Sequence, residues 1–217
     1  MILLQRCFAL LLCAAATTIH AESLETQIQE LARAWDAAYF ATEDDTQREK
    51  ALAALAPRAR ALHEAWPERA EPLIWEGIVL STWAGAKGGL GALDLVKQAR
   101  ERLQRAENID PKALNGSVYT SLGSLYYQVP GWPLSFGNDD KAAAYLKKAL
   151  VINPDGVDPN YFYGDYLIEE GRYQEALPVL ERALQAKPRP GRELADAGRQ
   201  AQVRKALAKI RAKVAAR

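Results

Sequence analysis

The chain has 217 residues, of which 49% are hydrophobic and 25% are charged, with 28 lysines and arginines against 27 aspartates and glutamates. A chain of this length and apolar content can bury a substantial core, which excludes wholesale disorder. The near-zero net charge excludes a strongly basic surface over the whole chain, so we expect no nucleic-acid partner.

The first 21 residues have the pattern of a secretory signal peptide. Arg6 supplies the positive end, residues 7–16 form a short apolar run, and Ala21 offers a small residue for cleavage. The run is shorter than the roughly 20 apolar residues that span a bilayer. We therefore expect a periplasmic protein that loses residues 1–21. The alternative is an uncleaved N-terminus that anchors the protein in the inner membrane.

Residues 22–217 offer little for catalysis, because both cysteines precede them and His63 is their sole histidine. Glu64 follows His63, but the second histidine of a zinc-protease motif is absent. The glycine-rich run 85–91 lacks the Ser or Thr that follows Lys in a phosphate-binding loop. We expect a protein that is not an enzyme, with no catalytic residue, metal or cofactor.

The rest of the chain reads as helix after helix. Strong helix formers dominate, and no segment shows the alternation of a half-buried strand. Turn signals such as Asp110-Pro111 and Asn153-Pro154 separate the periodic segments. The pattern predicts an all-α fold with helices over 23–39, 46–64, 70–83, 91–107, 113–128, 139–151, 158–170, 173–186 and 192–214.

Three residues of one predicted helix and the proline after it recur 34 positions later: Ala142, Leu146, Ala149 and Pro154 return as Ala176, Leu180, Ala183 and Pro188. Together with the glycines and tyrosines of the preceding helices, this pattern resembles the tetratricopeptide repeat (TPR). The resemblance implies a right-handed superhelix of about four antiparallel helix pairs plus a C-terminal capping helix. We expect Gly164 and Ala176 where helices approach closely, and Tyr119, Leu122, Tyr126, Leu146, Leu167 and Leu180 as fillers.

Three segments follow from this reading: the signal peptide 1–21, a TPR-like domain over 22–190, and a basic amphipathic capping helix over 191–217. Two repeats carry insertions, of seven residues within 116–154 and of about ten within 70–111. The last segment is basic, since residues 187–217 hold ten bases and two acids. Its apolar residues Val203, Leu207, Ile210 and Val214 share one face. The basic side of this helix could touch an anionic membrane surface or an acidic partner.

In the TPR family, five positions of the first helix of each pair face a concave groove. Carried over to this chain, they imply Ser117, Thr120, Ser124, Tyr127 and Gln128, and then Asp158, Tyr161, Asp165, Ile168 and Glu169. This mixture of hydroxyls, aromatic rings and acids suits a peptide or protein segment of some basic character, or a polar small ligand. The resemblance therefore implies a non-enzymatic scaffold that binds a protein or peptide in the cell envelope.

A second resemblance rests on the Pro-rich insertion 129–139, the signal segment and the divergent helix pairs. This combination is similar to the T-component proteins of periplasmic TRAP transporters, a helical repeat family thought to hold an apolar ligand and to contact a binding protein. It implies an alternative function, an accessory of solute transport. Such a protein would bind a small apolar or organic-acid ligand in a pocket lined by Tyr127, Trp132, Phe136 and Tyr161.

Overall fold

The computed structural model describes residues 22–215, and this part of the chain is helical without a strand. The predicted signal peptide and the last two residues lie outside the described residues. In chain order the elements are α1 (Leu24–Asp36), the π-helical segment η1 (Ala37–Ala41), α2 (Asp45–Ala65), α3 (Ala70–Lys87), the 3₁₀ turn η2 (Leu90–Ala92), α4 (Leu93–Ile109), α5 (Ala113–Gln128), α6 (Asp139–Ile152), α7 (Val157–Glu169), α8 (Tyr173–Leu184) and α9 (Glu193–Ala215).

Several helices begin where a side chain can satisfy their first amides. The Ser23 hydroxyl accepts from Thr26 N at 3.2 Å, and Asn138 Oδ1 accepts from Lys141 N at 2.8 Å. Asp44 does the same for Gln47 N at 2.8 Å. Short polar side chains at this position compensate amides that have no partner within the helix. The helix starts therefore lie within a few residues of those that the sequence predicts.

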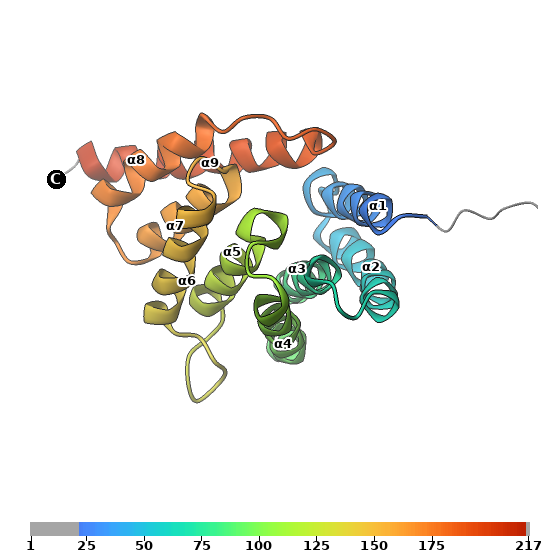
Figure 1. Ribbon diagram of the computed structural model, residues 1–217. Coiled ribbons are helices and arrows are strands. Elements are labelled where there is room, and N and C mark those ends of the chain that lie inside the picture. The colour runs from blue at the N-terminus through green and yellow to red at the C-terminus, as the bar shows by residue number, and fades with distance from the viewer. Residues whose placement is uncertain (1–21, 216–217) are drawn as a thin grey trace, which may run out of the picture.

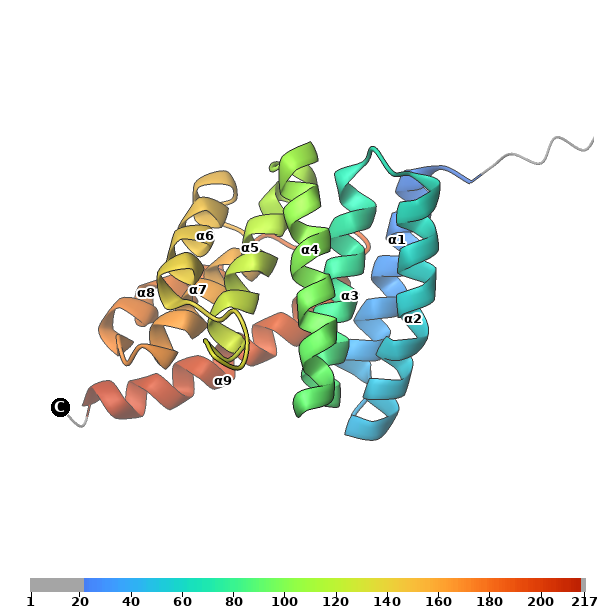
Figure 2. The ribbon, with the colours of Figure 1, turned by 90° about the horizontal axis from the view of Figure 1, so that it is seen from below.

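Successive helices pair and stack side by side into a curved slab (Figures 1 and 2). In each of three pairs, a glycine of the first helix lies against a leucine of the second. A methyl group added at Gly77 would lie 2.6 Å from Leu103 Cγ, and Gly123 and Gly164 have the same relation to Leu146 and Leu180. The same contact thus recurs in α3–α4, α5–α6 and α7–α8, despite the two insertions. The predicted all-α, TPR-like superhelix is confirmed, and so is the close approach at Gly164.

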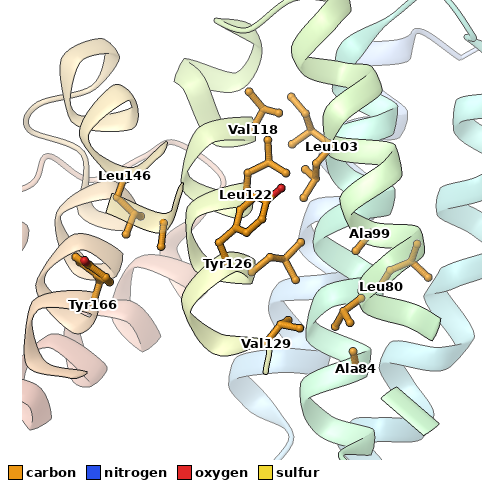
Figure 3. Close-up of a cluster of buried hydrophobic side chains, with 14 of the residues drawn as sticks. Leu80, Ala84, Ala99, Leu103, Val118, Leu122, Tyr126, Val129, Leu146 and Tyr166 are labelled. Atoms are coloured by element: carbon orange, nitrogen blue, oxygen red, sulfur yellow. The ribbon is translucent and has the colours of Figure 1, made fainter. Parts of the chain in front are cut away.

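The core follows the repeat. Figure 3 shows Leu122 and Tyr126 of α5 between Leu103 of α4 and Leu146 of α6, and all four side chains are buried. Five of the six expected fillers are buried, as is Ala176. Tyr119 is only half-buried: its ring packs against Tyr145 at 5.9 Å, with Lys148 Nζ over it. It therefore lies at the edge of the core rather than in the gap between helices.

Helix α9 runs across the slab from the α1 end to the α8 end (Figure 1). Its second half packs on α7 and α8 through the buried side chains of Val203, Leu207 and Ile210. Its first half reaches η1, where a methyl group added at Gly198 would collide with the Phe40 ring. The side chain of Val214 lies outside the described part of α9. Between residues 22 and 215, no helix combines the length and the apolar character needed to cross a bilayer.

Candidate functional site

The concave positions of α5 are mostly satisfied within the helix itself. The Ser117 hydroxyl donates to Leu114 O at 2.7 Å, and the Ser124 hydroxyl donates to Ser121 O at 3.0 Å. Thr120 is buried. The Ser117 and Ser124 hydroxyls therefore have no proton left to donate to a ligand, although they can still accept, and Thr120 is largely inaccessible.

Tyr127 of α5 and Asp165 of α7 form a direct link across the concave face. The Tyr127 hydroxyl donates to Asp165 Oδ2 at 2.7 Å, and Gln128 Nε2 donates to the Tyr127 oxygen at 3.0 Å. Burial, reinforced by the Asp165 charge, raises the pKa of Tyr127 well above its ordinary value. Next along α7, Ile168 is buried, whereas the Glu169 side chain is exposed to solvent. Three predicted groove residues thus form one connected group.

Asp158 and Tyr161 hold the chain's own arginine from α9. Arg199 Nε donates to Asp158 Oδ1 at 2.8 Å, and the guanidinium lies 4.6 Å from the Tyr161 and Phe162 ring centres and 5.6 Å from that of Phe40. Arg199 is 5% exposed, so its charge depends on these partners. We call Asp158, Tyr161, Phe162 and Phe40 the Asp158 socket.

A second arginine is held at the other end of the same face. Arg192 Nε and Nη2 donate to the two carboxylate oxygens of Asp36 at 2.8 and 2.7 Å, with the guanidinium 5.2 Å from the Trp75 ring centre. Asp36 is 2% exposed. We call Asp36 and Trp75 the Asp36 socket. The sequence analysis did not predict the Asp36 socket, because Asp36 and Trp75 lie more than 100 residues before Arg192. The one signal for such a pairing was that bases gather in the last segment of the chain and acids in the segments before it.

We expect low pH to weaken the ion pairs of Asp158 with Arg199 and Arg189 and so to lower the stability of the protein. Burial alone would raise the pKa of Asp158, but Arg199 and Arg189 outweigh it and lower the pKa to about 2. An unfolded aspartate titrates near 3.9, so the ion pairs contribute fully above about pH 4 and their contribution is lost as the pH falls toward 2.

Thermal melting at several pH values between 5 and 2 measures this loss. We expect the melting temperature of the native chain to fall more steeply over this range than that of Asp158→Asn, which has no carboxylate at this position to protonate. Parallel curves for the two proteins would contradict the assignment.

The two insertions meet around a cavity of about 420 Å³ at the C-terminal ends of α3 and α5. No charged side chain lines this cavity. Its wall includes Leu90 and Leu134, whose side chains are 79% and 61% exposed. Phe136 instead packs against Tyr126, with Arg100 over its ring, and Trp132 is 89% exposed. The wall of this cavity consists of Ser81, Ala84, Gly85, Gly89, Leu90, Ala92, Leu93, Val96, Ser124, Leu125, Gln128, Val129, Pro130 and Leu134. Of the candidate site residues, it therefore includes Ser124 and Gln128.

A buried carboxylate interrupts the regular repeat in α3. Glu76 is 1% exposed, at the position where the next two repeats carry Leu122 and Tyr163. Its Oε2 lies 2.5 Å from His63 Nδ1 and 3.2 Å from Arg102 Nε. His63 is thus engaged by an acid of the neighbouring helix. Within residues 22–215, no three potential ligands of a metal ion cluster together.

Comparison with known proteins identifies the same repeat. Residues 134–197 match the tetratricopeptide repeat family model. The crystal structure of TTC0263, a thermophilic TPR protein in Thermus thermophilus, is 17% identical over 83% of this chain and 98% of that chain, with a TM-score of 0.42. For Pseudomonas aeruginosa pilF the values are 17% identity, 87% and 90% coverage and a TM-score of 0.35. Curated protein sequences gave no match.

The family match assigns residues 134–197 to the tetratricopeptide repeat, within a chain whose stacked helix pairs form an extended surface. The matched segment includes α6, α7 and α8 and the start of α9, and therefore contains Asp158, Tyr161 and Phe162 of the Asp158 socket. A repeat of this class supports a scaffold for protein–protein interaction.

Proposed function

We propose that the protein is a non-enzymatic scaffold of the periplasm that binds a protein or peptide partner on its concave face. The observation that carries this proposal is the chemistry of α7, where Asp158, Tyr161, Asp165 and Glu169 place acids and a ring on the same face. Acids beside aromatic rings suit arginine and lysine side chains. The partner is therefore a protein segment with basic side chains.

Site-specific photo-crosslinking tests the concave face. A photoreactive phenylalanine analogue at Gln128 or Glu169, both exposed members of the face, is expected to capture a defined envelope protein in living cells. The matched control is the same analogue at Val151, which is 83% exposed on α6. Adducts that are absent from both concave positions, or the same adducts from all three, would contradict the proposal.

The cavity between the insertions favours a second candidate function, that of a transport accessory which holds a small apolar ligand. Its walls carry no charge, and the Ser81 and Ser124 hydroxyls already donate to Gly77 O and Ser121 O. A cavity of about 420 Å³ is within the usual range for small-molecule sites. These features favour an uncharged apolar ligand over an organic acid, since nothing in the wall would neutralise a carboxylate.

Binding of an uncharged apolar dye, Nile red, measures this property. We expect Leu134→Asp to weaken dye binding at least tenfold, because a carboxylate in the wall must be desolvated when the dye enters. Val151→Asp, which changes an exposed apolar side chain away from the cavity, should leave binding unchanged. Equal binding by the native chain and both variants would argue against the cavity as a ligand site.

The cellular location belongs to the same proposal. The signal pattern of residues 1–21 supports export to the periplasm, and an uncleaved N-terminus would leave the scaffold on the inner membrane. Arg204, Lys205 and Lys209 are exposed on α9. A basic helix face of this kind is suited to the anionic headgroups of a membrane surface.

A further inference from the structure

The Asp36 and Asp158 sockets bind two arginines that are a fixed distance apart along one helix. Arg192 directly precedes α9 and Arg199 lies within it, seven residues later. Seven residues are about two helical turns, or roughly 10 Å of axial rise, so both side chains leave the same side of the helix. A helix that fills both sockets must therefore carry two arginines at this spacing.

Both sockets are built for arginine rather than lysine. The Asp36 carboxylate receives two parallel N–H bonds from the Arg192 guanidinium. In the Asp158 socket, the Arg199 guanidinium is surrounded by aromatic rings and also donates Nη1 to Gln202 Oε1 at 2.6 Å. A lysine ammonium has neither the planar fork nor the flat face that these contacts use.

The two halves of α9 are attached by different forces. Val203, Leu207 and Ile210 are at most 3% exposed, and burial of such apolar side chains resists detachment. The first half is held by the charged contacts of Arg192 and Arg199, by Asp196, which accepts from Arg189 N and Nε at 2.7 Å, and by the close contact of Gly198 with Phe40. An incoming arginine would restore the bonds of each socket acid, so replacing one helix by another leaves neither acid unpaired.

The connection before α9 is not helical, and Arg189 within it is bonded to the first turn of that helix. Residues 185–192 lie outside the helices, and they include Pro188, Pro190 and Gly191, the last with φ +73°. Proline cannot continue a helix and glycine adopts left-handed angles at no steric cost, so α9 does not continue the direction of α8. Arg189 of this segment donates to Asp196 of α9 and to Asp158 of α7, so displacement of the first half must also break these bonds.

We propose that the first half of α9 is the resident occupant of a binding site for an arginine-bearing partner helix. The partner carries two arginines seven residues apart and displaces Arg192 and Arg199 from the Asp36 and Asp158 sockets. This inference rests on the proposed function, because it names the partner chemistry and the regulation of the same concave face.

A labelled synthetic peptide with the sequence of residues 187–213 is the probe. We expect it to bind the full chain weakly, and at least tenfold more tightly when Arg192→Ala and Arg199→Ala together empty the sockets of the protein. Changing both corresponding arginines of the peptide to lysine should weaken that binding at least tenfold. Changing the peptide's Arg204, which is exposed in the native chain, to lysine should have no effect.

Three results would overturn the proposal. One is equal peptide affinity for the native chain and the double variant, and another is indifference to the lysine changes. The third is a dimer of the double variant without peptide, or of the native chain, in which α9 is exchanged between copies. That dimer would assign the sockets to a second copy of the chain.

Hydrogen exchange of the native chain tests the inference without any variant. Amides in residues 197–200, which lie beyond the first turn of α9, should exchange at least tenfold faster than those in residues 203–210. Uniformly slow exchange along α9 would overturn the proposal even if the double variant fails to fold. Crosslinking at Gln128 and Glu169 reports on the scaffold function separately, so a captured partner without arginine-dependent peptide binding would leave that function standing.

Discussion

Replacing Gly123 by valine is expected to lower the free energy of unfolding by about 2–3 kcal/mol. A Cβ at this position would lie 2.6 Å from Leu146 Cγ and 3.2 Å from the Leu146 backbone nitrogen, so α5 and α6 would have to move apart. Both helices belong to the middle repeat, and the displacement would disturb the pairs on either side. Chemical denaturation measures the effect.

The matched control is Gly85→Ala, also in a helix. Nothing lies within 4 Å of a Cβ added there. Alanine should therefore raise the free energy of unfolding by about 0.5–1 kcal/mol, through helix propensity alone. Destabilisation of similar size at both glycines would mean that close approach is not the reason for Gly123.

Leu146→Ala provides a second control, through coupling. Alone it should cost about 2–5 kcal/mol, because Leu146 is fully buried and its loss leaves a cavity. Combined with Gly123→Val, the new side chain can occupy part of the vacated space. The double variant should then be more stable than the sum of the single effects predicts, and strict additivity would count against direct contact.

Replacing Asp158 by alanine is expected to cost about 2–4 kcal/mol, because Arg199 would keep a buried charge without its carboxylate partner. The side chain of Arg199 is 6% exposed, whereas that of Asp158 is 28% exposed, so the main penalty falls on the arginine. Arg189 loses the same partner but keeps Asp196 at 2.6 Å. Equilibrium unfolding of the variant gives this cost.

Glu181→Ala is the control for an ion pair of the same chemistry in water. Its bond to Arg211 is 2.9 Å long, but the arginine and glutamate side chains are 61% and 45% exposed. Such pairs contribute at most about 1 kcal/mol. We also expect Arg199→Ala together with Asp158→Ala to be less harmful than Asp158→Ala alone, since no charge is then left buried. A double variant that is much less stable than Asp158→Ala would show that the aromatic contacts of Arg199 dominate.

The repeat could be predicted because its determinants are local and recur. Glycine and alanine at close contacts, leucine between helices and proline after them appear at the same spacing in several repeats. The insertions were visible as departures from that spacing. The contacts of Gly123 with Leu146 and of Gly164 with Leu180 follow from the same pattern.

The candidate site was only partly predictable. The family register placed Tyr127, Asp158 and Asp165 on one face, and the structure joins Tyr127 to Asp165. It also shows that the chain's own Arg199 already engages Asp158. No local pattern indicates that pairing, because charge complementarity has no fixed spacing in sequence. The apolar cavity likewise depends on two insertions that meet only after the helices stack.

The sequence by itself determined the helices, their pairing and the repeat, because periodicity and small side chains act over one or two turns. Only the tertiary structure decided which acid receives which arginine, and that α9 crosses to η1 as well as covering the last pair. The Asp36 socket joins residues 156 positions apart. Such a contact is fixed by the accumulated curvature of all the helix pairs, a property that no single segment encodes.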